Sequence, residues 1–208
     1  KLKIAGTSAL VKGLFRKVVA RLSGRVVARS VVELAAIPVF ALWNAFICRK
    51  VMREARVRAL GPSFAGEVYE IAFPNGFSSL DEVLQKACIM TIREQIVATS
   101  SRHPNLARMG HKLFTNASAT KLDEAEHGGL ASTLSNLDSS QRKMVFEFLL
   151  VICALDGKVC AKERRMLRRL APVVDVDSAE AISRAKNYAE SVMEGRALRS
   201  GEVKFAFE

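Results

Sequence analysis

The first hydrophobic pattern in the chain is an aliphatic stripe that repeats every four positions between residues 9 and 28. Repeats of this period place side chains on one face of an α-helix, so the pattern predicts an amphipathic helix whose other positions are largely basic. Such a helix can lie on an anionic bilayer or pack on an ordinary protein core, and the sequence leaves both readings open. The stripe consists of Leu10, Leu14, Val18, Leu22 and Val26, and the cations are Lys12, Arg16, Lys17, Arg21 and Arg25.

Residues 31–48 form a long apolar run with positive charge at both ends. Its length and the charged residues at its ends are close to those of a membrane-spanning helix. Glu33, Asn44 and the central Pro38 argue against a simple span, because each would need a partner or a kink. A buried helical hairpin or a shallowly inserted helix broken at Pro38 fits better. Soluble core, membrane insertion and a true span all remain open.

The basic run over residues 49–58 continues the helical pattern. Gly61 and Pro62 then predict its end, since glycine suits a C-terminal cap and proline cannot continue the hydrogen-bond ladder. A short helix is expected from Pro62 to about Phe73, followed by a turn over residues 74–76.

Ser79 and Glu82 have the spacing of a capping box, which predicts a helix capped by Ser79 and ending near Ala98. Residues 99–137 are rich in Ser, Thr, Asn, Gly and His, and they read as short helices and loops between two halves of the chain.

The C-terminal region shows the clearest pattern. A helix capped by Asp138 or Ser139 runs to about Leu155 and has almost no polar face over residues 145–152, which predicts a central position in its bundle. A turn at Asp156-Gly157 follows. Two more helices are expected, one from about Ala161 to Pro172, and one that is opened by the capping box of Asp177 and Glu180 and runs to about Met193.

These elements predict an all-α protein, a helical bundle with two helical subdomains. We expect a basic, apolar helical region over residues 1–100, connecting short helices and loops over residues 101–137, and a helical module over residues 138–208.

The formal charge of +11 arises entirely in residues 1–60. This region carries thirteen Lys or Arg against Glu33 and Glu54, while the remaining 148 residues hold nineteen of each sign. Such asymmetry indicates a polyanionic partner, either an anionic membrane surface or nucleic acid, although a solvated basic face is the alternative. The candidate anion-binding residues are Lys12, Arg16, Lys17, Arg21, Arg25, Arg49, Lys50 and Arg53.

The four cysteines form no Cys-x-x-Cys pair, and no cleavable signal is evident at the start of the sequence. A reducing, cytoplasmic location, peripheral at the inner face of the membrane, is the simpler expectation.

The segment Leu149–Glu163 resembles the TerB-like (tellurite-resistance protein B) helical domain, whose feature is a buried helix, an Ala-x-Asp-Gly-x-Val turn and a Glu opening the next helix. The matching residues are Ala154, Asp156, Gly157, Val159 and Glu163. The resemblance implies a role in membrane-linked stress responses, and in some members metal binding through acidic residues. For Asp156, Gly157 and Glu163 we favour a structural role, because a hard cation needs more oxygen ligands and the next helix is basic.

A fainter likeness to the EcsC-like family of bacterial membrane-associated proteins lies in residues 29–62, carried by Ile37-Pro38 and Trp43-Asn44 before the basic run. Trp43 and Phe46 could anchor at a membrane interface, and core packing is their other use.

No glycine-rich phosphate loop, nucleophile elbow or zinc spacing occurs in the sequence. The pair Glu124 and His127 has the spacing of half a carboxylate-bridged metal site, but no second copy exists. We expect no cofactor, and whether a metal binds is undetermined.

The leading hypothesis is a non-enzymatic, bacterial, peripheral membrane protein whose C-terminal module meets a protein partner. The alternatives are a soluble nucleic-acid-binding protein that uses the same basic region, and an enzyme assembled from residues such as Glu33, Asn44 and His111.

Overall fold

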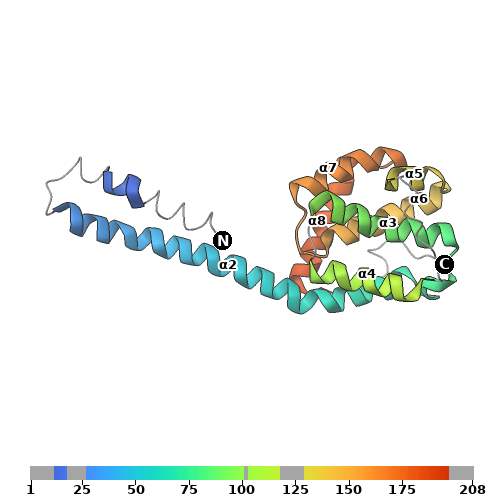
Figure 1. The fold of residues 1–208 in the computed structure, drawn as a ribbon, viewed down its shortest axis with the longest axis horizontal. Coiled ribbons are helices and arrows are strands. Elements are labelled where there is room, and N and C mark those ends of the chain that lie inside the picture. Colours follow the sequence, from blue (N-terminus) through green and yellow to red (C-terminus); the bar gives the residue numbers. More distant parts are fainter. Residues whose placement is uncertain (1–11, 18–26, 101–102, 118–128, 197–208) are drawn as a thin grey trace. The chain divides into compact units, whose positions relative to one another are not determined.

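The structure, a computed structural model, describes residues 12–17, 27–100, 103–117 and 129–196, with backbone alone for residues 27–36. The described chain is all helical, which confirms the predicted all-α bundle (Figure 1). Residues 12–17 are helical. The further elements are α2 (Val27–Ala72), the 3-10 helix η1 (Phe77–Ser79), α3 (Glu82–Thr99), α4 (Pro104–Asn116), α5 (Leu130–Ser135), α6 (Ser139–Ala154), α7 (Ala161–Leu170), the 3-10 helix η2 (Ala171–Val174) and α8 (Ser178–Glu194).

The chain divides into two units, an N-terminal unit of residues 1–52 and a compact unit of residues 53–208. The division falls within α2, so one helix contributes to both units. The expected segments 1–100, 101–137 and 138–208 do not coincide with these units. The reason is that α3 packs extensively on α6, which places residues on both sides of the expected connection in one core.

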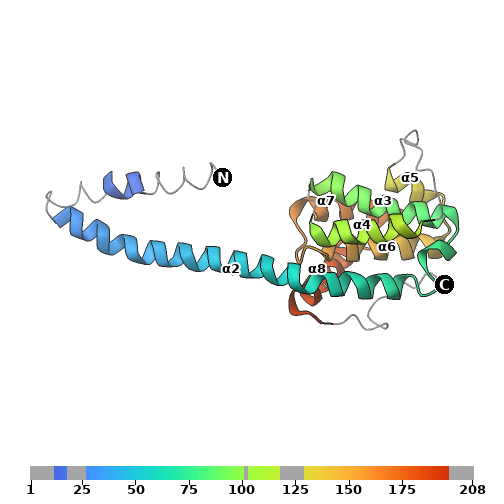
Figure 2. The ribbon, with the colours of Figure 1, turned by 60° about the horizontal axis from the view of Figure 1, so that its bottom comes forward.

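Helix α6 is the centre of the compact unit, as its apolar sequence predicts. Its residues from Val145 onward are buried, and it packs most extensively against α3 and α8. Helix α3 packs on both α4 and α6 within this unit (Figure 2). Aromatic packing joins the end of α2 to α6. The ring of Phe73 packs edge-on against the ring of Phe148, with the centroids 5.5 Å apart, and it packs in the same way against the ring of Phe77, with the centroids 5.0 Å apart.

Helix α2 is continuous through Pro38, Gly61 and Pro62, so the predicted break and the predicted helix end are both wrong. Tertiary contact explains the second case. The amide nitrogen Nδ2 of the buried Asn105 donates to the carbonyl of Val57 at 3.2 Å, and a β-carbon added at Gly61 would lie only 1.8 Å from this nitrogen. The glycine therefore admits a buried side chain rather than ending the helix.

The predicted N-terminal caps are confirmed for two helices and wrong for a third. Asp138 and Asp177 cap α6 and α8 as predicted, and α8 ends at Gly195 in the left-handed conformation. Ser79 is not the cap of α3. Asp81 takes that role by accepting from the backbone N–H of Leu84, while Ser79 closes η1.

Candidate functional site

The described part of the N-terminal unit presents large apolar side chains to the surface. Side chains from residue 37 to residue 48 are exposed apart from the half-buried Ile47, so the expectation that this run forms a soluble core is wrong for these residues. Trp43 and Phe46 do not pack in a core either; both are exposed, with ring centroids 6.0 Å apart. Among the described residues, no helix is long and apolar enough to cross a membrane.

Five of the exposed large side chains in this stretch share one side of α2, and the exposed Ile37 lies on the other. Successive helical residues are rotated by about 100°, so five of them fall within about 160° of the helix circumference. The small residues Ala41 and Ala45, together with Asn44, fall on the other side. We call the five exposed residues the apolar side of α2: Val39, Phe40, Leu42, Trp43 and Phe46.

Two cations follow the apolar side directly. Lys50 comes one helical turn after Phe46 and Arg49 comes two turns after Leu42, which places both on the same side of the helix. Both cations are exposed, and no carboxylate of the described residues pairs with either. A bilayer presents this same order of environments, with acyl chains next to anionic headgroups.

The other predicted anion-binding residues have different surroundings. Lys12, Arg16 and Lys17 are exposed in the short helix of residues 12–17, beside the exposed Leu14 and Phe15. Arg21 and Arg25 lie outside the described residues. The guanidinium of Arg53 donates to the carbonyl of Gly157 at 2.6 Å, so this cation also holds the compact unit together.

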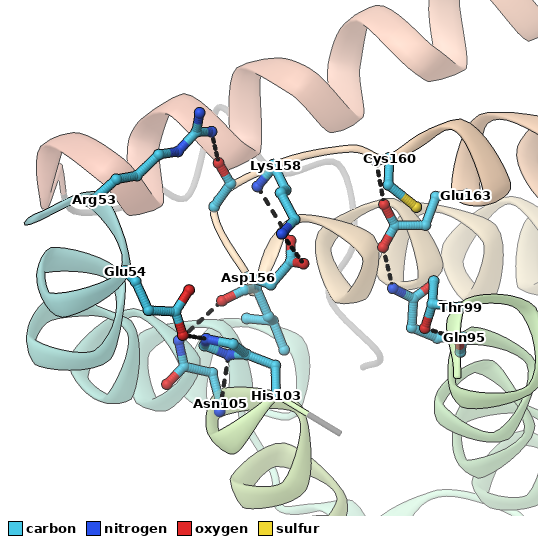
Figure 3. A network of polar contacts seen from close by, with 12 residues as sticks. Arg53, Glu54, Gln95, Thr99, His103, Asn105, Asp156, Lys158, Cys160 and Glu163 are labelled. Atoms are coloured by element: carbon cyan, nitrogen blue, oxygen red, sulfur yellow. Dashed lines mark hydrogen bonds and ion pairs between the residues drawn. The ribbon is translucent and has the colours of Figure 1, made fainter. Parts of the chain in front are cut away.

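Local hydrogen bonds and one positive φ shape the turn between α6 and α7. Gly157 has a φ of 72°, and the carboxylate of Asp156 accepts from the backbone N–H of Lys158 at 3.2 Å. The carboxylate of Glu163 accepts from the N–H of Cys160 and from the side-chain amide of Gln95 (Figure 3).

Burial raises the pKa of Glu163, and the hydrogen bonds from Cys160 and Gln95 oppose that rise. Burial also raises the pKa of Asp156, against the opposing charge of Lys158. The described residues contain no group of three or more His, Cys, Asp or Glu side chains that could hold a metal ion.

Figure 3 also shows a polar cluster that the sequence did not predict. His103 caps α4 by accepting from the N–H of Asn105 through Nδ1, and its Nε2 faces the carboxylate of Glu54 at 3.6 Å. A hydrogen bond from Arg58 lowers the pKa of Glu54, and burial opposes this effect. The Nδ2 atom of Asn105 also donates to the carbonyl of Leu155 at 2.9 Å. Residues 54, 103 and 155 are far apart in sequence, so no local pattern marks their contact.

Of the candidate catalytic residues, Glu33 is described by its backbone alone. Asn44 is exposed on α2 in the N-terminal unit, and His111 is exposed on α4 in the compact unit. The pair Glu124 and His127 lies outside the described residues. The four cysteines are free, and burial raises the pKa of Cys88, which disfavours the nucleophilic thiolate there.

Comparison with protein-family models, with curated proteins and with solved structures finds no match to this chain.

Proposed function

We propose that this chain is a non-enzymatic, peripheral membrane protein that docks on an anionic bilayer through residues 12–17 and the apolar side of α2. The observation that carries the proposal is the exposure of five large apolar side chains immediately before the free cations Arg49 and Lys50. Exposed apolar patches rimmed by charge mark membrane or partner sites, because leaving such area in water is unfavourable.

The energetics favour insertion of these side chains at the interface. Leu42 is 72% exposed and Phe46 is 58% exposed. Full burial of one such side chain contributes about 1.5–3 kcal/mol. Each cation near an anionic surface adds about 1 kcal/mol. Both terms favour the membrane-bound state over the state in water.

The compact unit serves in this proposal as an interaction or sensing module at the cytoplasmic face of a bacterial membrane. Its support is the TerB-like pattern of Ala154, Asp156, Gly157, Val159 and Glu163, in which Gly157 and Glu163 make the turn and the cap that the pattern requires.

Vesicle binding by the full chain tests the proposal, with Trp43 as the reporter because it is the single tryptophan of the sequence. We expect Trp43 emission to shift to shorter wavelength on vesicles containing phosphatidylserine. Phe46→Asp should weaken binding by about a hundredfold or more, since it replaces a ring that would insert into the bilayer with a charge.

Phe114→Asp is the matched control, because Phe114 is 54% exposed but lies on α4 in the compact unit. Equal losses of vesicle binding from Phe46→Asp and Phe114→Asp would contradict the proposal. Absence of binding to every vesicle, together with salt-sensitive binding of duplex DNA, would favour the nucleic-acid alternative.

A further inference from the structure

Helix α7 of the compact unit has a strongly basic face. Four of its cations are exposed, and at about 100° per residue they fall within about 120° of the helix circumference. We call this set the basic face of α7: Lys162, Arg165, Arg168 and Arg169.

Most of this charge is unneutralised. Arg169 pairs with Glu94 of α3, whereas no carboxylate of the described residues pairs with Lys162, Arg165 or Arg168. The carboxylate of Glu163 on the same helix is buried and accepts hydrogen bonds from Cys160 and Gln95, so it leaves the surface charge unopposed.

Helix stability explains only part of the pattern. Cations in the last turn, such as Arg168 and Arg169, interact favourably with the negative end of the helix dipole. Lys162 lies in the first turn, where the dipole disfavours a cation. An interaction of Lys162 with an external anion therefore explains its position better than the helix dipole does.

The surroundings of the basic face favour a lipid surface over nucleic acid. Val97, which is 71% exposed, lies one turn along α3 from Glu94, the residue that holds Arg169. An exposed aliphatic side chain one turn from this ion pair suits the headgroup region of a bilayer. Helix α7 has no aromatic residue on which a base could stack.

We propose that the basic face of α7 is a second membrane-docking surface, which binds anionic phospholipid headgroups. The inference rests on the proposed function, because residues 12–17 and the apolar side of α2 supply the first attachment. Once the chain is attached, the compact unit experiences a high effective concentration of headgroups, so a weak surface of a few cations is sufficient to dock it.

Partition of the full chain onto vesicles, followed by Trp43 emission, tests this surface. The test variant combines Lys162→Gln, Arg165→Gln and Arg168→Gln. The matched control combines Arg108→Gln, Lys143→Gln and Lys186→Gln, which removes the same charge from exposed positions on α4, α6 and α8. Each chain is measured on phosphatidylcholine vesicles and on vesicles that also contain phosphatidylserine.

We expect the α7 variant to bind the anionic vesicles ten- to a hundredfold more weakly than the unsubstituted chain, at about fivefold for each cation that reaches the surface. The control should change binding by less than about threefold. On phosphatidylcholine alone the three chains should bind alike, because the apolar side of α2 supplies that binding.

Equal weakening by the variant and the control would overturn the α7 surface and leave the attachment through α2 intact. Failure of the unsubstituted chain to bind the anionic vesicles, or insensitivity of that binding to Phe46→Asp, would count against the proposed function instead. Tight binding of duplex DNA that the α7 variant abolishes would overturn the assignment to lipid.

Discussion

The contact between Gly61 and Asn105 gives the sharpest test of the compact unit. Asn105 is 1% exposed, and its amide donates to the carbonyls of Val57 and Leu155. Asn105→Ala leaves buried carbonyls without these donors, and we expect it to lower the free energy of unfolding by about 2–4 kcal/mol.

Gly61→Ala should act through the same amide. A β-carbon at residue 61 would lie 1.8 Å from Nδ2 of Asn105, so the amide must leave its place and lose both hydrogen bonds. Alanine regains up to about 1 kcal/mol of helix propensity, so the net cost should be about 1–3 kcal/mol. In a chain that already carries Asn105→Ala, the same substitution should instead stabilise by up to about 1 kcal/mol.

Urea unfolding followed by circular dichroism at the helical band measures this double-mutant cycle, and the expected coupling is about 2–4 kcal/mol. Gly66→Ala is the control, because nothing lies within 4 Å of a β-carbon added at that position of the same helix. A coupling below about 0.5 kcal/mol would refute the reasoning, since it would mean that Gly61 and Asn105 do not share a packing site.

Three further predictions concern the compact unit. Gly157→Ala should destabilise it by about 2 kcal/mol or more in urea unfolding, because residue 157 has a positive φ and its β-carbon would lie 2.6 Å from Cγ2 of Val57. Burial raises the pKa of Glu163 above its unfolded value, so the folded state binds this proton more tightly and stability falls as the pH rises between the two values. Glu163→Gln should therefore flatten the pH dependence of the unfolding free energy in that window, and an unchanged slope would show that Glu163 does not titrate there. Tyr188→Phe should cost about 1–2 kcal/mol, because the buried Glu147 loses the hydroxyl that donates to it; a change within about 0.3 kcal/mol would contradict this.

The sequence alone determined the helical class and most local features of the C-terminal half. The caps at Asp138 and Asp177 and the positive φ at Gly157 depend on neighbours within a few positions. Helical periodicity and capping act over one or two turns, which is the range that a sequence pattern records.

The candidate membrane segment was predicted in part. Its cations and apolar residues are evident in the sequence, but apolarity alone does not distinguish a core helix from an exposed one. The structure decided this point for residues 37–48, because their side chains are exposed except for the half-buried Ile47, and the buried residues of the described core begin at Val57. Because α2 is continuous, Lys50 lies one helical turn after Phe46 and therefore on the same side of the helix.

Only the tertiary structure decided where α2 ends and where the compact unit begins. Gly61 and Pro62 have the local signature of a helix end, yet the packing of α2 on the core and the amide of Asn105 hold the helix through them to Ala72. In the same way, Gln95 meets Glu163 across 68 positions of sequence. Local propensities differ by about 1 kcal/mol per residue, and burial of a helix face contributes several times as much, so long-range packing overrides the local signal.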